Sequence, residues 1–210
     1  MNIVFFYGLI FIVFIAIVLY KAKNQQKLNA EIQAFAMQKG LAYQARAMAE
    51  SVITEPDIFD ARLQVADLVV DPSGAQTFLL SATRREGKEQ ISLYFLGSKH
   101  AVKNQASFTL LPTNANMNFY RFNGLSPLKF ESDDLNRIFR LAVKPGDEVN
   151  TLELLSPNMM LWLVQQAPNS IVVARPGGLY VFMPKVVSPF ESQFNIINAI
   201  ADYLVAHISG

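Results

Sequence analysis

Residues 3–20 read IVFFYGLIFIVFIAIVLY, and this run divides the chain into two unlike parts. It holds seventeen apolar or aromatic residues and Gly8, and it carries no charge. A helix of this length rises about 27 Å, close to the hydrocarbon thickness of a bilayer. Tyr7 and Tyr20 lie near its ends, where amphipathic rings suit the membrane interface. The run therefore predicts a transmembrane helix, which forms an anchor over residues 1–22.

Two other interpretations of this run are a cleaved signal peptide and a helix that the rest of the chain buries. A signal peptide has a basic N-terminal region and a small-residue cleavage site. Here only Met1 and Asn2 precede the run, and it ends in Val18-Leu19-Tyr20-Lys21. These features favour an uncleaved anchor.

Basic residues follow the run but do not precede it. Lys21, Lys23 and Lys27 lie just after Tyr20. The positive-inside bias places such a flank on the cytoplasmic side. We therefore expect a single-pass membrane protein, in contact with the lipid bilayer, whose globular domain is cytoplasmic.

The composition of the remaining residues excludes several functions. The chain of 210 residues has 18 basic and 17 acidic residues, all after Tyr20, and a net charge of +1. This balance leaves no basic excess for nucleic-acid binding. The absence of cysteine excludes disulfides, thiolate nucleophiles and cysteine-ligated metal sites. About 190 residues after the run suffice for one medium domain or two small ones.

The segment after the run predicts a juxtamembrane helix over residues 23–40. Leu28, Ile32 and Phe35 recur at helical spacing, and Gly40 is suited to end the helix. This stripe is a coiled-coil seam between two anchored copies, or it packs on the domain of its own chain. Because it lasts only about two heptads, we expect packing on its own domain.

The middle of the chain predicts β-structure. Alternating apolar residues indicate strands, and the polar tip at residues 84–89 contains a glycine, as hairpins do. The predicted strands cover 41–46, 63–70, 77–83, 90–96, 106–111 and 119–122, with a turn at 71–74, a loop at 48–60 and an irregular segment at 123–134.

The last third of the chain has clear helix and turn signals. Ser156 precedes Pro157, which predicts the start of a helix that runs to Gln166. Pro176-Gly177 fits a type II turn. Strands are expected at 138–143, 170–174 and 179–183, and helices at 148–155 and from Ser188 onward. The fold class is therefore α+β, with an antiparallel sheet and packed helices in a domain over residues 41–210.

Candidate catalytic and binding residues are few, and each has a structural explanation. His100 and His207 lack metal-ligand spacing. The acidic pairs Asp57/Asp60, Asp133/Asp134 and Asp147/Glu148 fall where turns or helix starts account for them. The remaining candidates are the Gly177-Gly178 turn, the basic tip residues Arg84, Arg85 and Lys88, and the apolar group Met159, Met160 and Trp162. The sequence predicts no catalytic residue, cofactor or metal.

Two segments resemble a loose group of bacterial membrane-anchored proteins of unknown function. They are Phe35-Ala36-Met37-Gln38-Lys39-Gly40-Leu41-Ala42-Tyr43, and Leu154-Leu155-Ser156-Pro157 with Leu179-Tyr180-Val181-Phe182. The resemblance implies a single-span protein of the bacterial inner membrane with an α+β domain. It implies no catalytic residue.

The leading functional hypothesis is a membrane-tethered, non-enzymatic domain that binds a protein partner, a second copy of itself or the membrane surface. The first alternative is an envelope or lipid-processing enzyme that uses dispersed carboxylates. The second is a small-ligand sensor, which requires an apolar pocket in the domain.

Overall fold

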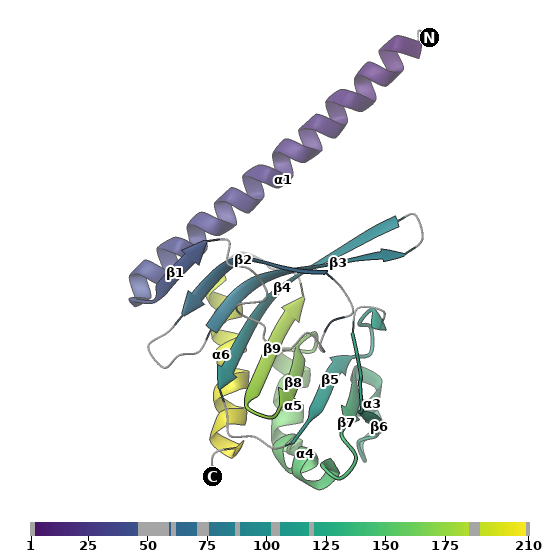
Figure 1. Ribbon diagram of the computed structural model, residues 1–210, viewed down its shortest axis with the longest axis vertical. Coiled ribbons are helices and arrows are strands. Elements are labelled where there is room, and N and C mark those ends of the chain that lie inside the picture. The colour runs from purple at the N-terminus through teal and green to yellow at the C-terminus, as the bar shows by residue number, and fades with distance from the viewer. Residues whose placement is uncertain are drawn as a thin grey trace.

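The computed structural model describes residues 3–45, 59, 62–70, 76–86, 89–101, 106–117, 120–184 and 190–208. It consists of a long N-terminal helix and an α+β domain (Figure 1). The α+β prediction is confirmed.

The helix α1 (Ile3–Lys39) is continuous. The predicted anchor (1–22) and the predicted juxtamembrane helix (23–40) therefore join without a break. Gly40 follows with φ 69°, a conformation that costs glycine little, and its N–H donates to the carbonyl of Met37. This ending turns the chain back along α1 into the first strand.

The predicted anchor falls largely on side chains outside the described part of the structure, namely those of residues 1–12 and Phe14. Among the residues that are described, no helix combines the length and the apolar character needed to cross a membrane.

Strands of the described residues form one nine-stranded antiparallel sheet, in the order β1-β2-β3-β4-β9-β8-β5-β7-β6. Their bounds are β1 Ala42–Ala45, β2 Arg62–Val70, β3 Gln76–Glu86, β4 Glu89–Ala101, β5 Phe108–Pro112, β6 Ser126–Leu128, β7 Phe139–Val143, β8 Ile171–Arg175 and β9 Gly178–Pro184. The predicted hairpin around residues 84–89 is confirmed as β3–β4.

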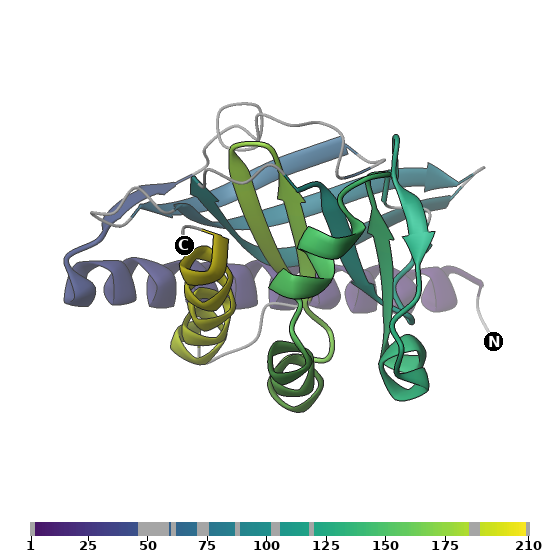
Figure 2. The ribbon, with the colours of Figure 1, turned by 90° about the horizontal axis from the view of Figure 1, so that it is seen from below.

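Helices cover one face of this sheet (Figure 2). They are α3 (Asp133–Ile138), α4 (Glu148–Leu154), α5 (Pro157–Gln166) and α6 (Phe190–Ile208). The predicted start of α5 is confirmed, because the Ser156 side chain accepts a hydrogen bond from the Met159 N–H and Pro157 opens the helix. The predicted cap of α6 at Ser188 lies outside the described residues.

Two predictions in the segment between β5 and β7 are wrong. The predicted strand 119–122 is reduced, in its described part, to an isolated bridge between Tyr120 and Phe59. The segment 123–134, predicted to be irregular, contains β6 and the start of α3. With three and six residues, these elements are too short to give a recognisable hydrophobic period.

The sheet is buried on both faces. Alternate residues of a strand lie on opposite faces, and Leu79, Leu96 and Val181 belong to the core beneath the helices. Their neighbours Phe78, Phe95 and Phe182 therefore face the other side, where they are also buried.

Aromatic rings form the core of this second face. The Phe59 ring lies 5.4 Å from that of Phe95, 5.6 Å from that of Tyr120 and 5.1 Å from that of Phe182, measured between centroids. Burial raises the pKa of the Tyr120 phenol. Through these contacts, Phe59, which precedes β2, and Tyr120, which follows β5, pack against the middle of the sheet.

Gly97 allows two of these rings to lie over β4. A Cβ at Gly97 would lie 2.6 Å from Cε2 of Phe78 and 2.8 Å from Cδ1 of Phe182. Real Cβ atoms do not tolerate such distances, so the rings occupy the space that only glycine leaves open.

Gly97→Ala is expected to destabilise the protein by about 1–3 kcal/mol, because the methyl group displaces both rings from a packed core. Thermal unfolding of the full chain in detergent, followed by circular dichroism, measures this. The control is Ser98→Ala on the same strand. The buried Ser98 Oγ has no hydrogen-bond partner among the described residues, so its removal should leave stability unchanged or higher. Equal stability of Gly97→Ala and wild type would contradict the packing argument.

Candidate functional site

The C-terminal part of α1 is built into the core of the domain. Ile32, Phe35 and Ala36 are buried among residues of the sheet and of α6. The Phe35 ring packs edge-on against Phe190 and Phe194 at centroid distances of 5.4 Å and 4.8 Å. The expectation that this stripe packs on its own domain is confirmed for Ile32 and Phe35.

Polar contacts complete this junction between α1 and α6. The Glu31 carboxylate (Oε1) accepts a hydrogen bond of 2.7 Å from the backbone N–H of Phe190, the first residue of α6. A helix N-terminus has unpaired N–H groups and a partial positive charge, and a carboxylate stabilises both. Lys39 pairs with Glu191 at 3.1 Å, but this pair is half exposed and contributes little.

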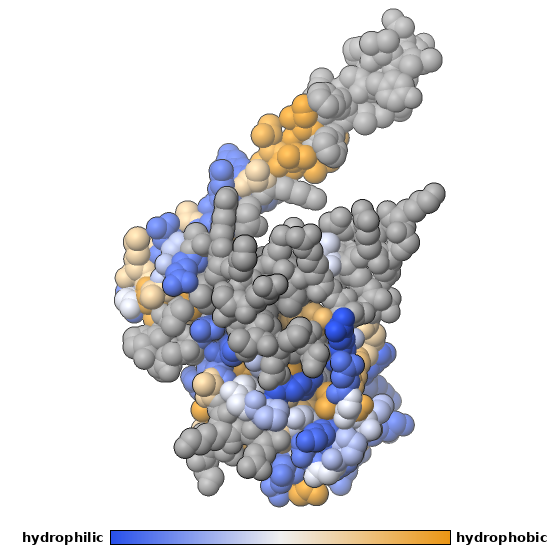
Figure 3. Space-filling model, in the orientation of Figure 1, coloured by the Kyte–Doolittle hydropathy of each residue, from blue (hydrophilic) through white to orange (hydrophobic). Residues whose placement is uncertain are grey.

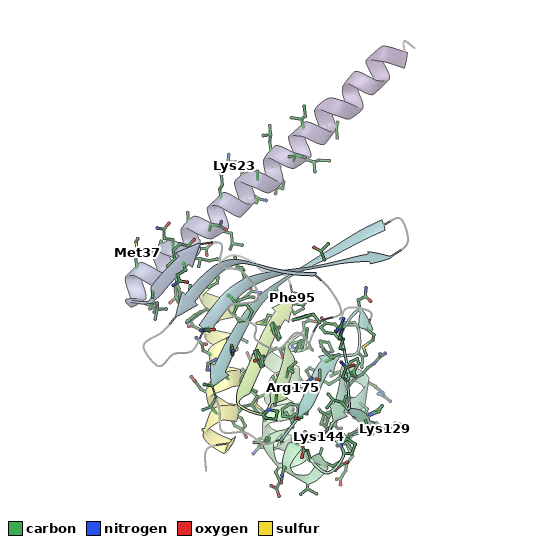
Figure 4. All side chains as sticks on the ribbon, in the orientation of Figure 1. Lys23, Met37, Phe95, Lys129, Lys144 and Arg175 are labelled. Atoms are coloured by element: carbon green, nitrogen blue, oxygen red, sulfur yellow. The ribbon has the colours of Figure 1, made fainter. Side chains whose placement is uncertain are left out.

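The part of α1 that precedes the junction leaves the domain with exposed apolar side chains. Described examples are Val13, Leu19 and Tyr20, which are 51%, 64% and 67% exposed. Figure 3 shows hydrophobic residues gathered on the projecting helix, followed by hydrophilic residues closer to the domain. Lys23, labelled in Figure 4, lies between the two. Such an exposed apolar surface requires a partner or a lipid environment.

An open pocket of about 240 Å³ lies at the ends of β7 and β8. Its lining includes two cations, Lys144 and Arg175, which lie near each other in Figure 4. The lining residues are Ser107, Asn123, Gly124, Leu125, Lys144 and Arg175. They include no carboxylate and no histidine, and the nearby Asp147 carboxylate accepts a hydrogen bond from the Ser107 backbone N–H.

Arg175 has a structural role in this pocket. Its guanidinium donates hydrogen bonds to the carbonyls of Phe108 (3.0 Å) and Ala174 (2.8 Å) and to the Thr109 hydroxyl (3.2 Å). These bonds join the end of β8 to β5. The pocket therefore suits a small anion near Lys144 better than it suits catalysis.

One apolar gap beneath the helices is closed by side chains. The gap between Ile32 on α1, Leu96 on β4 and Phe190 on α6 holds no space for a water molecule. This gap therefore does not provide the apolar pocket that a small-ligand sensor requires.

The two histidines lie on different elements, β4 and α6. His100 is half-buried on β4, opposite Leu179 on β9. His207 lies in the last turn of α6, and its side chain is outside the described part. The described side chains contain no group of three metal-ligating residues.

The predicted acidic pairs have structural roles where they are described. Asp133 and Asp134 lie in the first turn of α3, and Asp134 contacts Arg137 at 3.3 Å. Asp147 accepts from the Ser107 N–H at 2.8 Å, and Glu148 accepts from the Gly146 N–H at 2.8 Å. Asp57 and Asp60 lie outside the described residues.

The other candidates also take structural positions. Met159 and Met160 are buried and Trp162 packs against the core. Gly177 has φ 84°, the sign that the third residue of a type II turn requires, and it joins β8 to β9. The side chains of Arg84, Arg85 and Lys88 are outside the described part.

The junction residue that the sequence did not indicate is Glu31. It lies 159 positions from its partner Phe190. A charged residue on the polar side of a predicted helix gives no signal of such a distant contact. Its spacing beside Ile32 and Phe35 was the one available indication that it lies next to the buried stripe.

The fold belongs to a class in which a broad antiparallel sheet carries helices on one face and a long N-terminal helix at one edge. A solved structure with a similar fold is the crystal structure of the mycobacterial trehalose monomycolate transport factor A, TtfA. The TM-score is 0.57 at 12% sequence identity, and the match covers 86% of this chain and 93% of the other. No family model matches the sequence. No curated protein matches it either.

Glu31→Ala is expected to lower the free energy of unfolding by about 1–2 kcal/mol, because the first N–H of α6 loses its charged acceptor. It should also speed hydrogen exchange in the first turn of α6, measured by mass spectrometry. Glu31→Gln keeps an acceptor and should recover part of the loss. The control Glu191→Ala removes the half-exposed ion pair with Lys39 and an exposed acid in the first turn of α6, and it should cost less than about 1 kcal/mol. Equal effects of Glu31→Ala and Glu191→Ala would contradict a capping role.

Proposed function

We propose that this chain is a membrane-tethered, non-enzymatic accessory domain that acts in the transport of an envelope lipid. It acts by binding a protein partner, a second copy or the membrane surface. The proposal rests on the contrast between the two ends of α1. One end is packed into the domain core, and the other projects with exposed apolar side chains.

The membrane tether is supported by the sequence of the projecting part. Residues 3–20 contain no charge, and Lys21, Lys23 and Lys27 follow at once. This order of an apolar run and a basic flank is typical of a single-pass helix with a cytoplasmic C-terminal domain. Because α1 continues into the core, the helix holds the domain in a defined orientation to the bilayer.

A role in lipid transport is supported by the fold. TtfA, whose fold is similar, is a transport factor for trehalose monomycolate. The similarity covers 86% of this chain and 93% of TtfA.

The enzymatic alternative has no support among the described side chains. None of the described carboxylates is buried. The carboxylates with partners bind backbone N–H groups or exposed cations, as Glu31, Asp147 and Asp134 do. An acid/base pair would instead have its carboxylates facing one cleft.

The pair Ile12→Arg and Val13→Arg is expected to release the protein from membranes. Each arginine at the centre of a span costs roughly 3 kcal/mol of insertion free energy. Washing membranes with alkaline carbonate should leave wild type in the pellet and move this variant to the supernatant. The control, Val149→Arg with Leu161→Arg, adds the same charge at exposed positions of α4 and α5 and should stay in the pellet. Release of the wild type would refute the tether.

Cells depleted of the protein are expected to accumulate one envelope lipid in the membrane where it is made, while its synthesis continues. Pulse-labelling of lipids followed by separation of membranes measures this distribution. Wild type should restore it, and the variant Ile12→Arg/Val13→Arg should not. A lipid distribution unchanged by depletion would argue against a transport role.

A further inference from the structure

The β3–β4 hairpin extends beyond the rest of the sheet. Among the described residues, β2 pairs with β3 as far as Thr83, and β9 pairs with β4 from Phe95 onward (Figure 1). From Arg84 to Ile91 the two strands pair with each other, up to the pair Glu86–Glu89. We call residues 84–91 the arm. Gly87 and Lys88, at its tip, lie outside the described residues.

The arm and the projecting part of α1 extend toward the same end of the molecule. In Figure 1 the hairpin and the projecting part of α1 both extend to the right, and the N-terminal end of α1 lies well above the hairpin. Glu86 lies eight residues beyond the buried Phe78, about 26 Å along a strand. Tyr20 lies twelve residues before the buried Ile32, about 18 Å along the helix. The hairpin from Phe78 to the end of the arm is therefore longer than the stretch of α1 that separates the core from the apolar run.

Positive charge is concentrated at this end. Residues 84–89 read RREGKE, with three basic and two acidic residues, and Lys21, Lys23 and Lys27 flank the apolar run. Together these segments have a net charge of +4, whereas the whole chain has +1, so the rest of the chain has −3. The basic end suits an anionic lipid surface, and the rest does not.

We propose that the arm is a second membrane contact, in which its basic residues bind the headgroups of anionic phospholipids beside the anchor. This inference rests on the proposed anchoring by α1. Because α1 is packed against α6 through Phe35 and Glu31, anchor and arm belong to one body. Two separate contacts with one surface would fix the tilt of the domain, which a single helix leaves free.

Site-directed spin labelling tests the contact, since the chain has no cysteine that competes for the label. The full-length protein carries Gln90→Cys in the arm, Val18→Cys in α1 or Asn158→Cys at an exposed position of α5. Each nitroxide-labelled protein is placed in nanodiscs of phosphatidylcholine, with or without phosphatidylglycerol. Its accessibility to a water-soluble nickel chelate is then measured.

The label at Gln90 is expected to become shielded from the chelate when phosphatidylglycerol is present, whereas the label at Asn158 stays exposed. The label at Val18 should be shielded in both compositions. If Val18 is shielded but Gln90 is as exposed as Asn158 in both, the arm contact is wrong and the anchor stands. The charged tip then serves only to prevent edge pairing between copies. A Val18 label exposed to water would overturn the anchor and the arm contact together.

Two double variants test whether shielding of the Gln90 label depends on the positive charge of the arm. Arg84→Ser with Arg85→Ser, in the Gln90→Cys background, should lose the shielding, because each basic residue strengthens attraction to an anionic surface roughly fivefold. Lys129→Ser with Arg140→Ser removes the same charge at exposed positions beside β6 and on β7, far from the arm (Figure 1), and should keep it. Loss of shielding in both pairs would overturn a specific role for the arm.

Discussion

The contact of α1 with α6 determines how the parts of this molecule are arranged. Phe35 lies between Phe190 and Phe194, and burying a side chain of this size contributes roughly 1.5–3 kcal/mol. The Glu31 carboxylate accepts a hydrogen bond from one N–H at the start of α6, and this bond prevents α1 and α6 from sliding past each other. Without these contacts, the orientation of the domain relative to α1 would vary. With them, the sheet and its helices keep a fixed orientation relative to residues 3–20.

The sheet is rigid, so the fixed orientation of α1 applies to the whole domain. Its helix-covered face and its aromatic face are both packed, so the nine strands cannot shift relative to one another without opening a core. The two edge strands of the described sheet are short, with four residues in β1 and three in β6. Short edges offer little backbone for strand addition by a partner. Binding through surfaces of side chains is the mode that this architecture favours.

The sequence predicted the parts of the fold that depend on local chemistry. Ser156-Pro157 predicts the start of α5, Gly40 the end of α1 and Pro176-Gly177 the β8–β9 turn, because each signal arises within a few residues of the feature. β6 and α3 were missed because they form by pairing and packing with β7 rather than by their own periodicity. The contact of Glu31 with Phe190 and the requirement for glycine at Gly97 were also missed. Both depend on which distant residues the fold brings together.

The pocket of the domain offers few functional groups, whereas its exposed surfaces have distinctive features. The open pocket at the ends of β7 and β8 has its arginine engaged in joining β5 to β8, which leaves Lys144 as its accessible cation. The Lys144 side chain can attract an anion there. The exposed features are more distinctive: an apolar helix end, a basic flank and a hairpin that extends beyond its neighbours. The proposed membrane function therefore rests on these exposed features, which one packed body holds in fixed positions relative to each other.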